Sequence, residues 1–156
     1  MINHIKNQYS KKPKKRKSIS EKGFKELVQI LDKVFSEYIR LRDSNDNGWV
    51  RCITCGKVHF WSDGHQINCG HFIPRGNYAT RYDEKNNHGQ CVHCNRWKNG
   101  EWLIYEQKLI EMYGLNEVEN LKQKARIGGR PDNEMMRQMI SEYKEKVKMI
   151  KIDKGL

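Results

Sequence analysis

The chain has 156 residues, of which 37% are hydrophobic, and it carries a formal net charge of +11. This length is sufficient for one modest core with extensions. The sequence has no apolar signal segment at its N-terminus and no run approaching the ~18 apolar residues that a membrane span needs. We therefore exclude a membrane protein, expect an intracellular one, and predict a polyanionic partner such as nucleic acid.

The positive charge is concentrated at the N-terminus. Residues 1–19 hold seven lysines and arginines and no acid, whereas the other 23 basic residues are accompanied by 19 acidic ones. Like charges at this density repel one another, which predicts a disordered basic arm over residues 1–19. Four consecutive cations of this arm are candidate DNA contacts: Lys14, Lys15, Arg16 and Lys17. A tail that only improves solubility is the alternative.

Residues 20–43 are predicted to form an amphipathic helix. Gly23 is tolerated in its first turn, and Arg40 and Arg42 suit its C-terminal end. Its apolar residues recur at three- and four-residue steps: Phe24, Leu27, Val28, Leu31, Val34, Phe35, Tyr38, Ile39 and Leu41. A turn follows at Asp43–Gly48, and Trp49 begins a strand.

Two Cys-x-x-Cys pairs dominate residues 49–113: Cys52 with Cys55, and Cys91 with Cys94. Together they complete a tetrahedral four-sulfur zinc site with no open position, so this zinc is structural. The segment between the pairs exceeds the about 15–20 residues of a zinc ribbon and leaves room for a hairpin. Buried reduced thiols are one alternative. A disulfide framework is another, but the cysteine count of five is odd. The fifth, Cys69, is expected to be a packed thiol.

Helical periodicity returns after Gly100. A helix is predicted from Trp102 to Tyr113, and residues 114–156 are predicted to form a helical extension. Within it, one short helix ends near Ile127 and a last helix begins at Pro131. The inner stripe of that last helix is predicted to be Met135, Met139, Ile140, Tyr143 and Val147.

The segment between the two cysteine pairs carries residues suited to phosphodiester cleavage. That reaction needs a base to activate water and a cation to neutralise charge on the phosphate. A histidine suits the role of the base, because it titrates near neutral pH. His71 lies in the segment where a hairpin would present that base. Asn86 could hold its ring by hydrogen bonding, and Asn95 would project from a helix start towards a catalytic ion. A structural histidine is the alternative for His71.

These residues resemble the HNH nuclease pattern, with the final histidine replaced by asparagine, as in endonuclease VII. The closer resemblance is to the NinG (Rap) family of phage recombination endonucleases, and it covers about residues 50–125. Beyond the cysteines it comprises Gly70-His71-Phe72, Arg75-Gly76, Arg81-Tyr82-Asp83, Asn86-Asn87-His88-Gly89-Gln90, Asn95 and Gly100.

The resemblance implies a fold and an activity. The fold would be α+β and mostly helical, with a treble-clef, ββα-metal core flanked by helices at both ends. The activity would be the cleavage of branched DNA, such as Holliday junctions and D-loops, with Mg²⁺ or Mn²⁺. A phage or prophage protein would work in the cytoplasm of its bacterial host. Two symmetric cuts favour a homodimer.

One departure from the HNH pattern concerns the catalytic ion. Many HNH enzymes carry a carboxylate or histidine ligand just before the base, and this chain has Gly70 there. We expect His88 to replace it, because in an extended segment it would share a face with Asn86. Asp83 is the second candidate, as a hard oxygen ligand. An orienting role for His88 is the alternative, and His59, His65 and His93 have no assigned role.

Arg75, Arg81, Arg96 and Lys98 flank the proposed cleft and are expected to contact phosphates. Two other functions are consistent with the zinc site and the charge. The first is a zinc module that binds DNA without cutting it. The second is a phage accessory protein that uses its helices to bind a host recombinase or nuclease.

Overall fold

The computed structural model describes residues 18–156, so nearly all of the predicted basic arm, with Lys14, Lys15, Arg16 and Lys17, lies outside the described residues. The described part is mostly helical, with two small antiparallel sheets. It is therefore α+β, as predicted. Its elements are η1 (Ile19–Glu21), α1 (Phe24–Arg42), β1 (Trp49–Arg51), β2 (Val58–Phe60), β3 (Ile67–His71), α2 (Tyr78–Arg81), η2 (Glu84–Asn86), β4 (Asn87–Cys91), η3 (His93–Trp97), η4 (Asn99–Glu101), α3 (Trp102–Tyr113), α4 (Leu115–Ile127) and α5 (Asn133–Lys154).

The first long helix starts later than the sequence predicts. Gly23 is its N-cap residue, and the Gly23 backbone N–H donates to the Glu26 carboxylate at 3.2 Å. The residues before it form the separate 3₁₀ turn η1, and Ile19 packs against the main core. The predicted end of the basic arm at residue 19 is therefore wrong, because Ile19 begins η1 and packs against the main core.

The main core forms between α1 and α5. Phe35 of α1 meets Tyr143 of α5 edge to face, with ring centroids 4.9 Å apart. The prediction that Met135 faces this core is wrong, since Met135 is 54% exposed and Met136 is fully buried. Four-residue steps back from Ile140 lead to position 136, and position 135 lies about 100° away around the helix.

Two β-hairpins carry the cysteine pairs and His71, and in the second hairpin Cys91 and His71 lie at opposite ends. In the first, β1 pairs with β2; in the second, β3 pairs with β4. The register of the second places His71 opposite Asn87 and Gly70 opposite His88. Directly opposite residues of an antiparallel pair share a face, and successive residues alternate. His71 and His88 therefore lie on opposite faces of this hairpin.

Close packing accounts for the glycine before His71. A Cβ atom at Gly70 would lie 2.5 Å from Oε1 and 2.6 Å from Cβ of Gln90, whose side chain is fully buried. Any side chain at position 70 would have to displace Gln90. Packing therefore excludes a metal-binding side chain at position 70.

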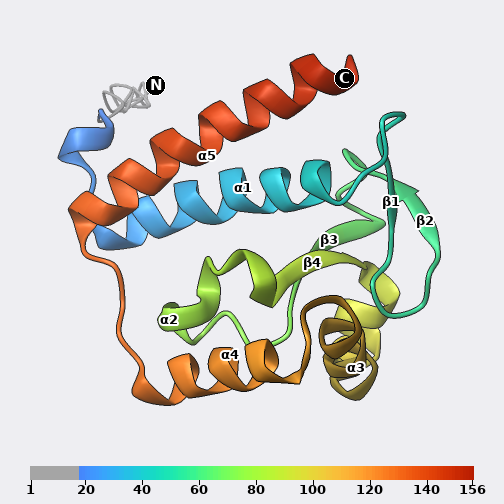
Figure 1. Cartoon of the computed structure of the whole chain (residues 1–156). Helices are drawn as coiled ribbons and strands as arrows, with labels where there is room; N and C mark the ends of the chain where they lie inside the picture. The colour runs from blue at the N-terminus through green and yellow to red at the C-terminus, as the bar shows by residue number, and fades with distance from the viewer. Residues whose placement is uncertain (1–17) are drawn as a thin grey trace, which may run out of the picture.

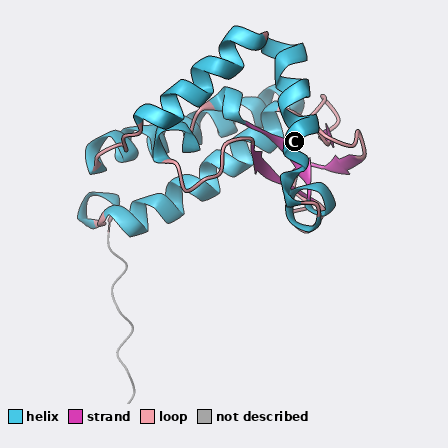
Figure 2. Cartoon of the chain, turned by 90° about the horizontal axis from the view of Figure 1, so that it is seen from below, coloured by secondary structure: helices cyan, strands magenta, loops and turns pink. Residues whose placement is uncertain are grey.

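The elements form layers across the molecule. Figure 1 shows α5 and α1 on one side, the β3–β4 hairpin and α2 in the middle, and α4 with α3 on the other side. The strands lie at one end of the molecule and helices make up the rest (Figure 2). Both ends of α5 are fixed: Arg137 donates to the Ile19 carbonyl at 3.4 Å, and Lys154 donates to the Leu41 carbonyl at 2.8 Å. Residues 114–156 thus complete the fold around the hairpin.

A smaller core joins α3 and α4 to the hairpin. Tyr105, Leu109 and Val118 are fully buried, and Phe72 packs against them just after β3. The Tyr105 hydroxyl donates to the Gly70 carbonyl at 3.0 Å. This contact fixes the backbone beside His71.

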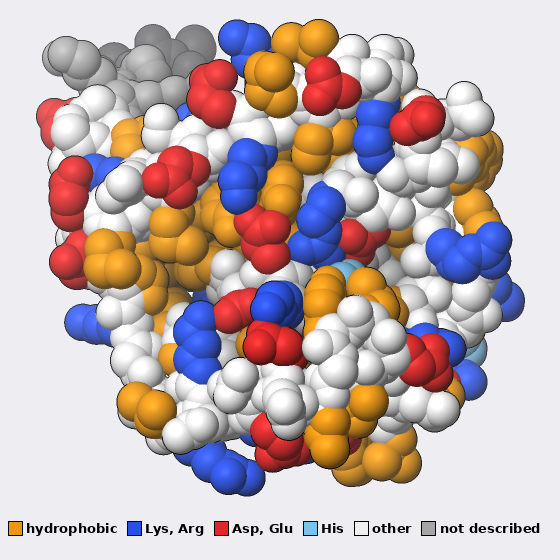
Figure 3. Space-filling model, in the orientation of Figure 1, with side chains coloured by type: hydrophobic (Ala, Val, Ile, Leu, Met, Phe, Trp, Pro, Cys, Tyr) orange, Lys and Arg blue, Asp and Glu red, His pale blue; other side chains and the backbone are white. Residues whose placement is uncertain are grey.

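The surface is strongly charged but mixed in sign. On the face shown in Figure 3, basic and acidic side chains alternate, so no single basic patch dominates this view. Within residues 18–156, the helices are all too short or too polar to cross a bilayer.

Candidate functional site

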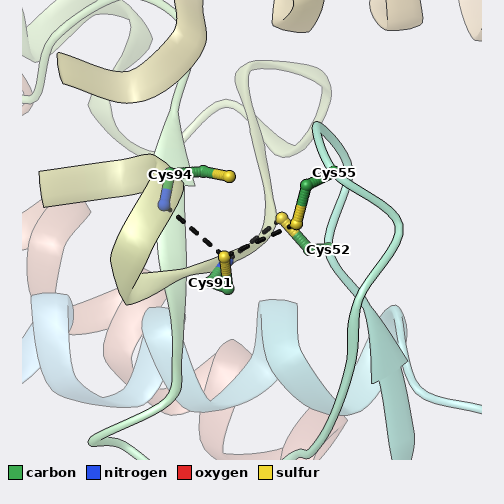
Figure 4. Close-up of side chains that lie close together, drawn as sticks. All are labelled: Cys52, Cys55, Cys91 and Cys94. Atoms are coloured by element: carbon green, nitrogen blue, oxygen red, sulfur yellow. Dashed lines mark hydrogen bonds between the residues drawn. The ribbon is translucent and has the colours of Figure 1, made fainter. Parts of the chain in front are cut away.

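The four cysteines of the two Cys-x-x-Cys pairs form one cluster. Cys52 and Cys55 come from the loop after β1, whereas Cys91 ends β4 and Cys94 lies in η3. Their four sulfurs lie within 4.8 Å of one another and face a common space (Figure 4). The Cys55 and Cys91 sulfurs are 3.7 Å apart, close to the about 3.8 Å that tetrahedral geometry gives for a Zn–S bond of 2.3 Å. The donor set and its spacing fit a structural zinc.

Backbone N–H groups donate to sulfurs of this cluster and so stabilise the thiolates that a metal cation would bind. The Cys91 N–H donates to the Cys52 sulfur at 3.2 Å, and the Cys94 N–H to the Cys91 sulfur at 3.5 Å. Burial would raise the pKa of the Cys52 thiol, but backbone hydrogen bonds from Cys55 and Cys91 outweigh it and lower that pKa to about 7. Burial raises the pKa of the Cys91 thiol to about 12, so a bound zinc would have to displace protons here.

Cys69 lies apart from the cluster, as predicted from its position. Its thiol donates to the Asn87 side-chain oxygen at 3.4 Å and packs against the main core. Burial raises the pKa of this thiol well above its usual value. Cys69 is therefore a protonated, packed side chain.

A polar pocket of about 420 Å³, here called the His71 pocket, lies between α1, the β3–β4 hairpin and the segment after Cys94. It brings together four residues that the sequence analysis predicts for catalysis or phosphate binding, namely His71, Arg75, Asn95 and Arg96. It is lined by Asp32, Phe35, Ser36, Asn68, Cys69, His71, Pro74, Arg75, Asn95, Arg96, Asn99 and Gly100.

His71 is held in its neutral form. Burial is the largest cause, and the positive charge of Arg81 adds to it, so the pKa of His71 falls to about 4. The nearby Asp32 carboxylate opposes this shift only in part. A neutral imidazole can accept a proton, as a general base must, but a pKa of about 4 makes His71 a weaker base than a histidine that titrates near neutral pH.

Asn86 does not hold the His71 ring. It is fully buried, its side-chain oxygen accepts from the Ile73 N–H at 2.8 Å, and its amide donates to the Ile73 and Thr80 carbonyls, both at 3.1 Å. Asn86 therefore fastens the loop that follows His71. The residue opposite His71 is Asn87, whose amide donates to the carbonyls of Arg81 and Asp83.

Of the predicted phosphate contacts, Arg75 and Arg96 line the His71 pocket together with Asn95. Lys98 is exposed and pairs with Glu101 at 2.7 Å. Arg81 differs, since it is only 8% exposed and its Nε donates to Asp32 at 2.8 Å. A phosphate at Arg81 would have to compete with that carboxylate.

Neither candidate for the missing ion ligand reaches the His71 pocket. His88 lies on the other face of the hairpin, where its ring is 3.0 Å from Arg42, 3.3 Å from Asp43 and 3.2 Å from the Tyr113 hydroxyl. The prediction that it shares a face with Asn86 is wrong, because Asn86 lies in a 3₁₀ turn and not in an extended strand.

Asp83 caps that same 3₁₀ turn through the Lys85 N–H, and its other oxygen pairs with Lys124 at 2.6 Å. Its contacts thus join the turn to α4. Neither Asp83 nor His88 is among the residues that surround His71 in the pocket.

The residue that the sequence analysis missed is Asp32. It is the one carboxylate among the residues that line the His71 pocket. Asn68, which also lines the pocket, has a buried side-chain nitrogen without a hydrogen-bond partner within the described part of the chain. The only sequence signal for Asp32 was an acid beside the apolar stripe of its helix, and solvent-facing acids give the same signal.

These features define a class: a small, mostly helical protein with a cluster of four cysteines suited to a structural metal, and a polar pocket. The family model described as "Bacteriophage Lambda NinG protein" matches residues 3–153. The chain belongs to the NinG family.

Curated relatives agree with this assignment. The chain is 29% identical to protein ninG of Salmonella phage P22, over 78% of this chain and 56% of that protein. It is 28% identical to protein ninG of Escherichia phage lambda, over 61% and 43%. The matched segments thus span about half of these relatives. The comparison with solved structures gave no match.

Proposed function

We propose that this protein is a structure-specific endonuclease that cleaves branched recombination intermediates, such as Holliday junctions and D-loops, by metal-dependent phosphodiester hydrolysis. The observation that carries the proposal is the placement of His71, held neutral, in one pocket with Asn95, Arg75 and Arg96. Hydrolysis of a phosphodiester requires a base to activate water and positive charge on the phosphate. His71 can supply the base, Arg75 and Arg96 can supply charge, and Asn95 can supply an amide oxygen for a metal ion.

The proposal includes an HNH-like, treble-clef core. The β3–β4 hairpin is followed directly by the helical turn η3, and Cys91 and Cys94 join the two. This order of a hairpin, a turn and a zinc cluster is what a ββα-metal motif requires. It supports His71 on the hairpin as the base and Asn95 on the turn as a ligand.

His71 would take a proton from the attacking water while the water oxygen bonds to phosphorus. The bond between phosphorus and the leaving oxygen then breaks, and that oxygen takes up a proton from solvent. Arg75 and Arg96 would hold the non-bridging phosphate oxygens. Asn86 acts at a distance, because it fastens the loop from Ile73 to Thr80 that carries Arg75.

A bound Mg²⁺ or Mn²⁺ would supply positive charge to the phosphate and the leaving oxygen. The oxygen donors in the pocket suit such a hard cation. They are the Asp32 carboxylate and the side-chain oxygens of Asn68 and Asn95. Asp32 takes the role proposed from sequence for His88 or Asp83, and a metal ion there would share both carboxylate oxygens with the donors of Arg81 and Tyr82.

The setting is proposed from the phage origin of the relatives. The relatives are phage proteins, so we place the activity in the cytoplasm of a bacterial host. Two matched cuts at a junction need two active sites, and we propose a homodimer on the DNA.

The test is cleavage of a four-way junction and of a linear duplex with Mg²⁺ or Mn²⁺, comparing the wild type with His71→Ala. Cutting should fall by about 100-fold or more, as for loss of a general base, while zinc content and junction binding stay unchanged. His65→Ala is the matched control, since His65 is exposed and does not line the pocket.

Near-normal cutting by His71→Ala would overturn the assignment of the base. If the wild type binds junctions without cutting them under any divalent ion, a non-cutting DNA-binding module is the better description. Asn95→Ala should raise the ion concentration needed for half-maximal cutting, and an unchanged concentration would leave Asn95 without a role at the ion.

A further inference from the structure

Two tryptophans in the segment that lines the His71 pocket are exposed to solvent. Trp97 is 78% exposed and Trp102 is 58% exposed, and Leu103, the next residue, is 65% exposed. We call Trp97 and Trp102 the aromatic rim. Large aromatic side chains bury about 150–250 Å² each when they are covered, so two exposed tryptophans five residues apart indicate a binding surface.

The aromatic rim belongs to the segment that forms one wall of the pocket. Asn95, Arg96, Asn99 and Gly100 all line the pocket. Trp97 directly follows Arg96, and Trp102 lies two residues after Gly100. A molecule that fills the pocket through its phosphate would therefore have its neighbouring groups close to this rim.

The backbone between the two tryptophans is strained. Asn99, Gly100 and Glu101 have φ angles of 51°, 83° and 50°, so two non-glycine residues adopt the left-handed region. Such residues persist only where the surroundings hold them. Here the Gln90 amide donates to the Gly100 carbonyl at 2.7 Å. Strain of this kind gathers at functional sites.

Positive charge near the aromatic rim favours an anionic partner. Arg96 is exposed, and none of the ion pairs found within residues 18–156 involves it. Arg75 lies across the same pocket. Aromatic side chains interleaved with unpaired cations are the combination that binds unpaired nucleotides, because the rings stack on bases and the cations contact phosphates.

We propose that Trp97 and Trp102 stack on base faces that are exposed at the branch point of the DNA, beside the phosphate held in the His71 pocket. The inference rests on the proposed function and adds how the enzyme would distinguish branched from linear DNA. In a linear duplex the bases are stacked on one another, and only a branch, a flap or a loop exposes base faces to the rim.

A second copy of the chain fits this surface less well. A stable interface needs about 800 Å² from each partner, more than two indole rings provide. Both copies would carry a net charge of +11 and would bring Arg96 towards its own equivalent. Nucleic acid fits better, because its phosphates would pair with Arg96 and the flat faces of its bases would cover the indole rings.

The experiment measures dissociation constants at one fixed salt concentration, with EDTA to prevent cleavage, for a four-way junction and for a linear duplex of equal length. We expect Trp97→Ala and Trp102→Ala each to weaken junction binding by about 10-fold, the loss typical of one base–aromatic stack. Duplex binding should change less than about 2-fold, since it rests on phosphate contacts.

Three controls make the result specific. Trp49→Ala removes another exposed tryptophan, 48% exposed and packed on Phe60 in the β1–β2 hairpin, and should leave the preference for junctions intact. Trp97→Phe and Trp102→Phe keep a ring and should retain most of that preference. Arg96→Ala should weaken junction and duplex binding alike.

The outcomes separate this inference from the proposed function. If Trp97→Ala and Trp102→Ala both prefer junctions as strongly as the wild type does, the proposal that the aromatic rim binds bases is wrong, whatever the cleavage activity. Loss of a dimer without any change in preference would also overturn it and would assign the rim to contacts between copies. Lost preference in a protein whose wild type never cuts DNA would support the rim and refute the hydrolysis.

Discussion

Asp32 of α1 and Arg81 of α2 form a two-point ion pair at the edge of the His71 pocket, with Nε–Oδ1 and Nη2–Oδ2 distances of 2.8 and 2.5 Å. The Tyr82 hydroxyl donates to the same carboxylate at 2.9 Å. The pair joins the main helix to the segment after His71. It also sets the charge around the imidazole, because Arg81 lowers the pKa of His71 and Asp32 raises it.

Asp32→Asn should destabilise the fold. The change keeps the size of the side chain but leaves the nearly buried Arg81 without its anion, which costs roughly 1–3 kcal/mol. Urea unfolding followed by circular dichroism measures the free energy of unfolding. Glu142→Gln, on the exposed side of α5, is the control and should have no effect. Equal stability of the two variants would show that the ion pair contributes nothing to the fold.

The four-cysteine cluster should hold about one zinc per chain, the stoichiometry of a four-thiolate site. Cys91→Ser should lose that zinc and unfold, because structural zinc supplies about 10–16 kcal/mol of apparent binding free energy to small domains. Cys69→Ser should keep both zinc and fold, since its sulfur lies outside the cluster. Metal analysis by mass spectrometry and thermal unfolding with a chelator measure both. A folded, zinc-free protein would contradict this prediction.

His71 should make stability depend on pH in acid. Its pKa is about 4 in the folded protein, below the about 6.5 of an unfolded chain. Between these values the unfolded state binds more protons. The contribution of His71 to the free energy of unfolding is therefore complete above pH 6.5, and it is lost as the pH falls towards 4.

His71→Gln removes this effect and keeps a polar side chain in the pocket. We expect the wild type to lose up to about 3 kcal/mol relative to His71→Gln as the pH falls from 7 to 4. Urea unfolding of both proteins, each with zinc bound, measures the difference. Parallel stability curves would show that His71 titrates at its usual pKa.

Asn86→Ala should cost stability as well as activity. Its side chain makes three hydrogen bonds to the backbone of Ile73 and Thr80. Removing it leaves a buried N–H and buried carbonyls unpaired, at about 1–3 kcal/mol each. Hydrogen exchange at the Ile73 amide should accelerate, whereas exchange in α5 should change less. A variant that loses cutting with unchanged stability would return Asn86 to the role predicted from sequence, orienting His71.

The basic arm should affect affinity and its salt dependence only. Residues 1–17 carry seven positive charges, and each phosphate contact they make contributes about 0.9 to the slope of log affinity against log salt. Removing these residues should flatten that slope, and cutting at saturating DNA should persist because the His71 pocket lies beyond them. Titrations at several salt concentrations measure it. An unchanged slope would make the arm a solubilising tail, and lost junction preference would show that it reads branch structure.

The sequence predicted features that depend on local spacing. The cysteine cluster follows from two Cys-x-x-Cys pairs, and α1, α3, α4 and α5 follow from apolar periodicity, with errors at Gly23 and Met135. His71, Arg75, Asn95 and Arg96 do share one pocket. Local helix or hairpin geometry determines where most of these residues lie. The four-cysteine cluster determines the position of the segment that carries Asn95 and Arg96.

The sequence could not predict partners that come from distant parts of the chain. Asp32 meets Arg81 only after α1 packs on the hairpin, and nothing near Asp32 in sequence indicates that contact. The prediction for His88 assumes an extended segment that includes Asn86, whereas Asn86 ends a 3₁₀ turn and His88 lies in the strand β4 that follows it. Buried polar side chains such as these take whichever backbone groups the packed fold leaves without partners.

Cys55 is the exposed member of the four-cysteine cluster, whereas Cys52, Cys91 and Cys94 are buried. Oxidants attack the thiolate they can reach, so peroxide should modify this sulfur first and release the zinc from that side. Because Cys94 lies in the turn that carries Asn95, zinc release would loosen the pocket wall as well. We expect the working lifetime of the protein in air to be limited by oxidation at one atom, well before heat unfolds the helices.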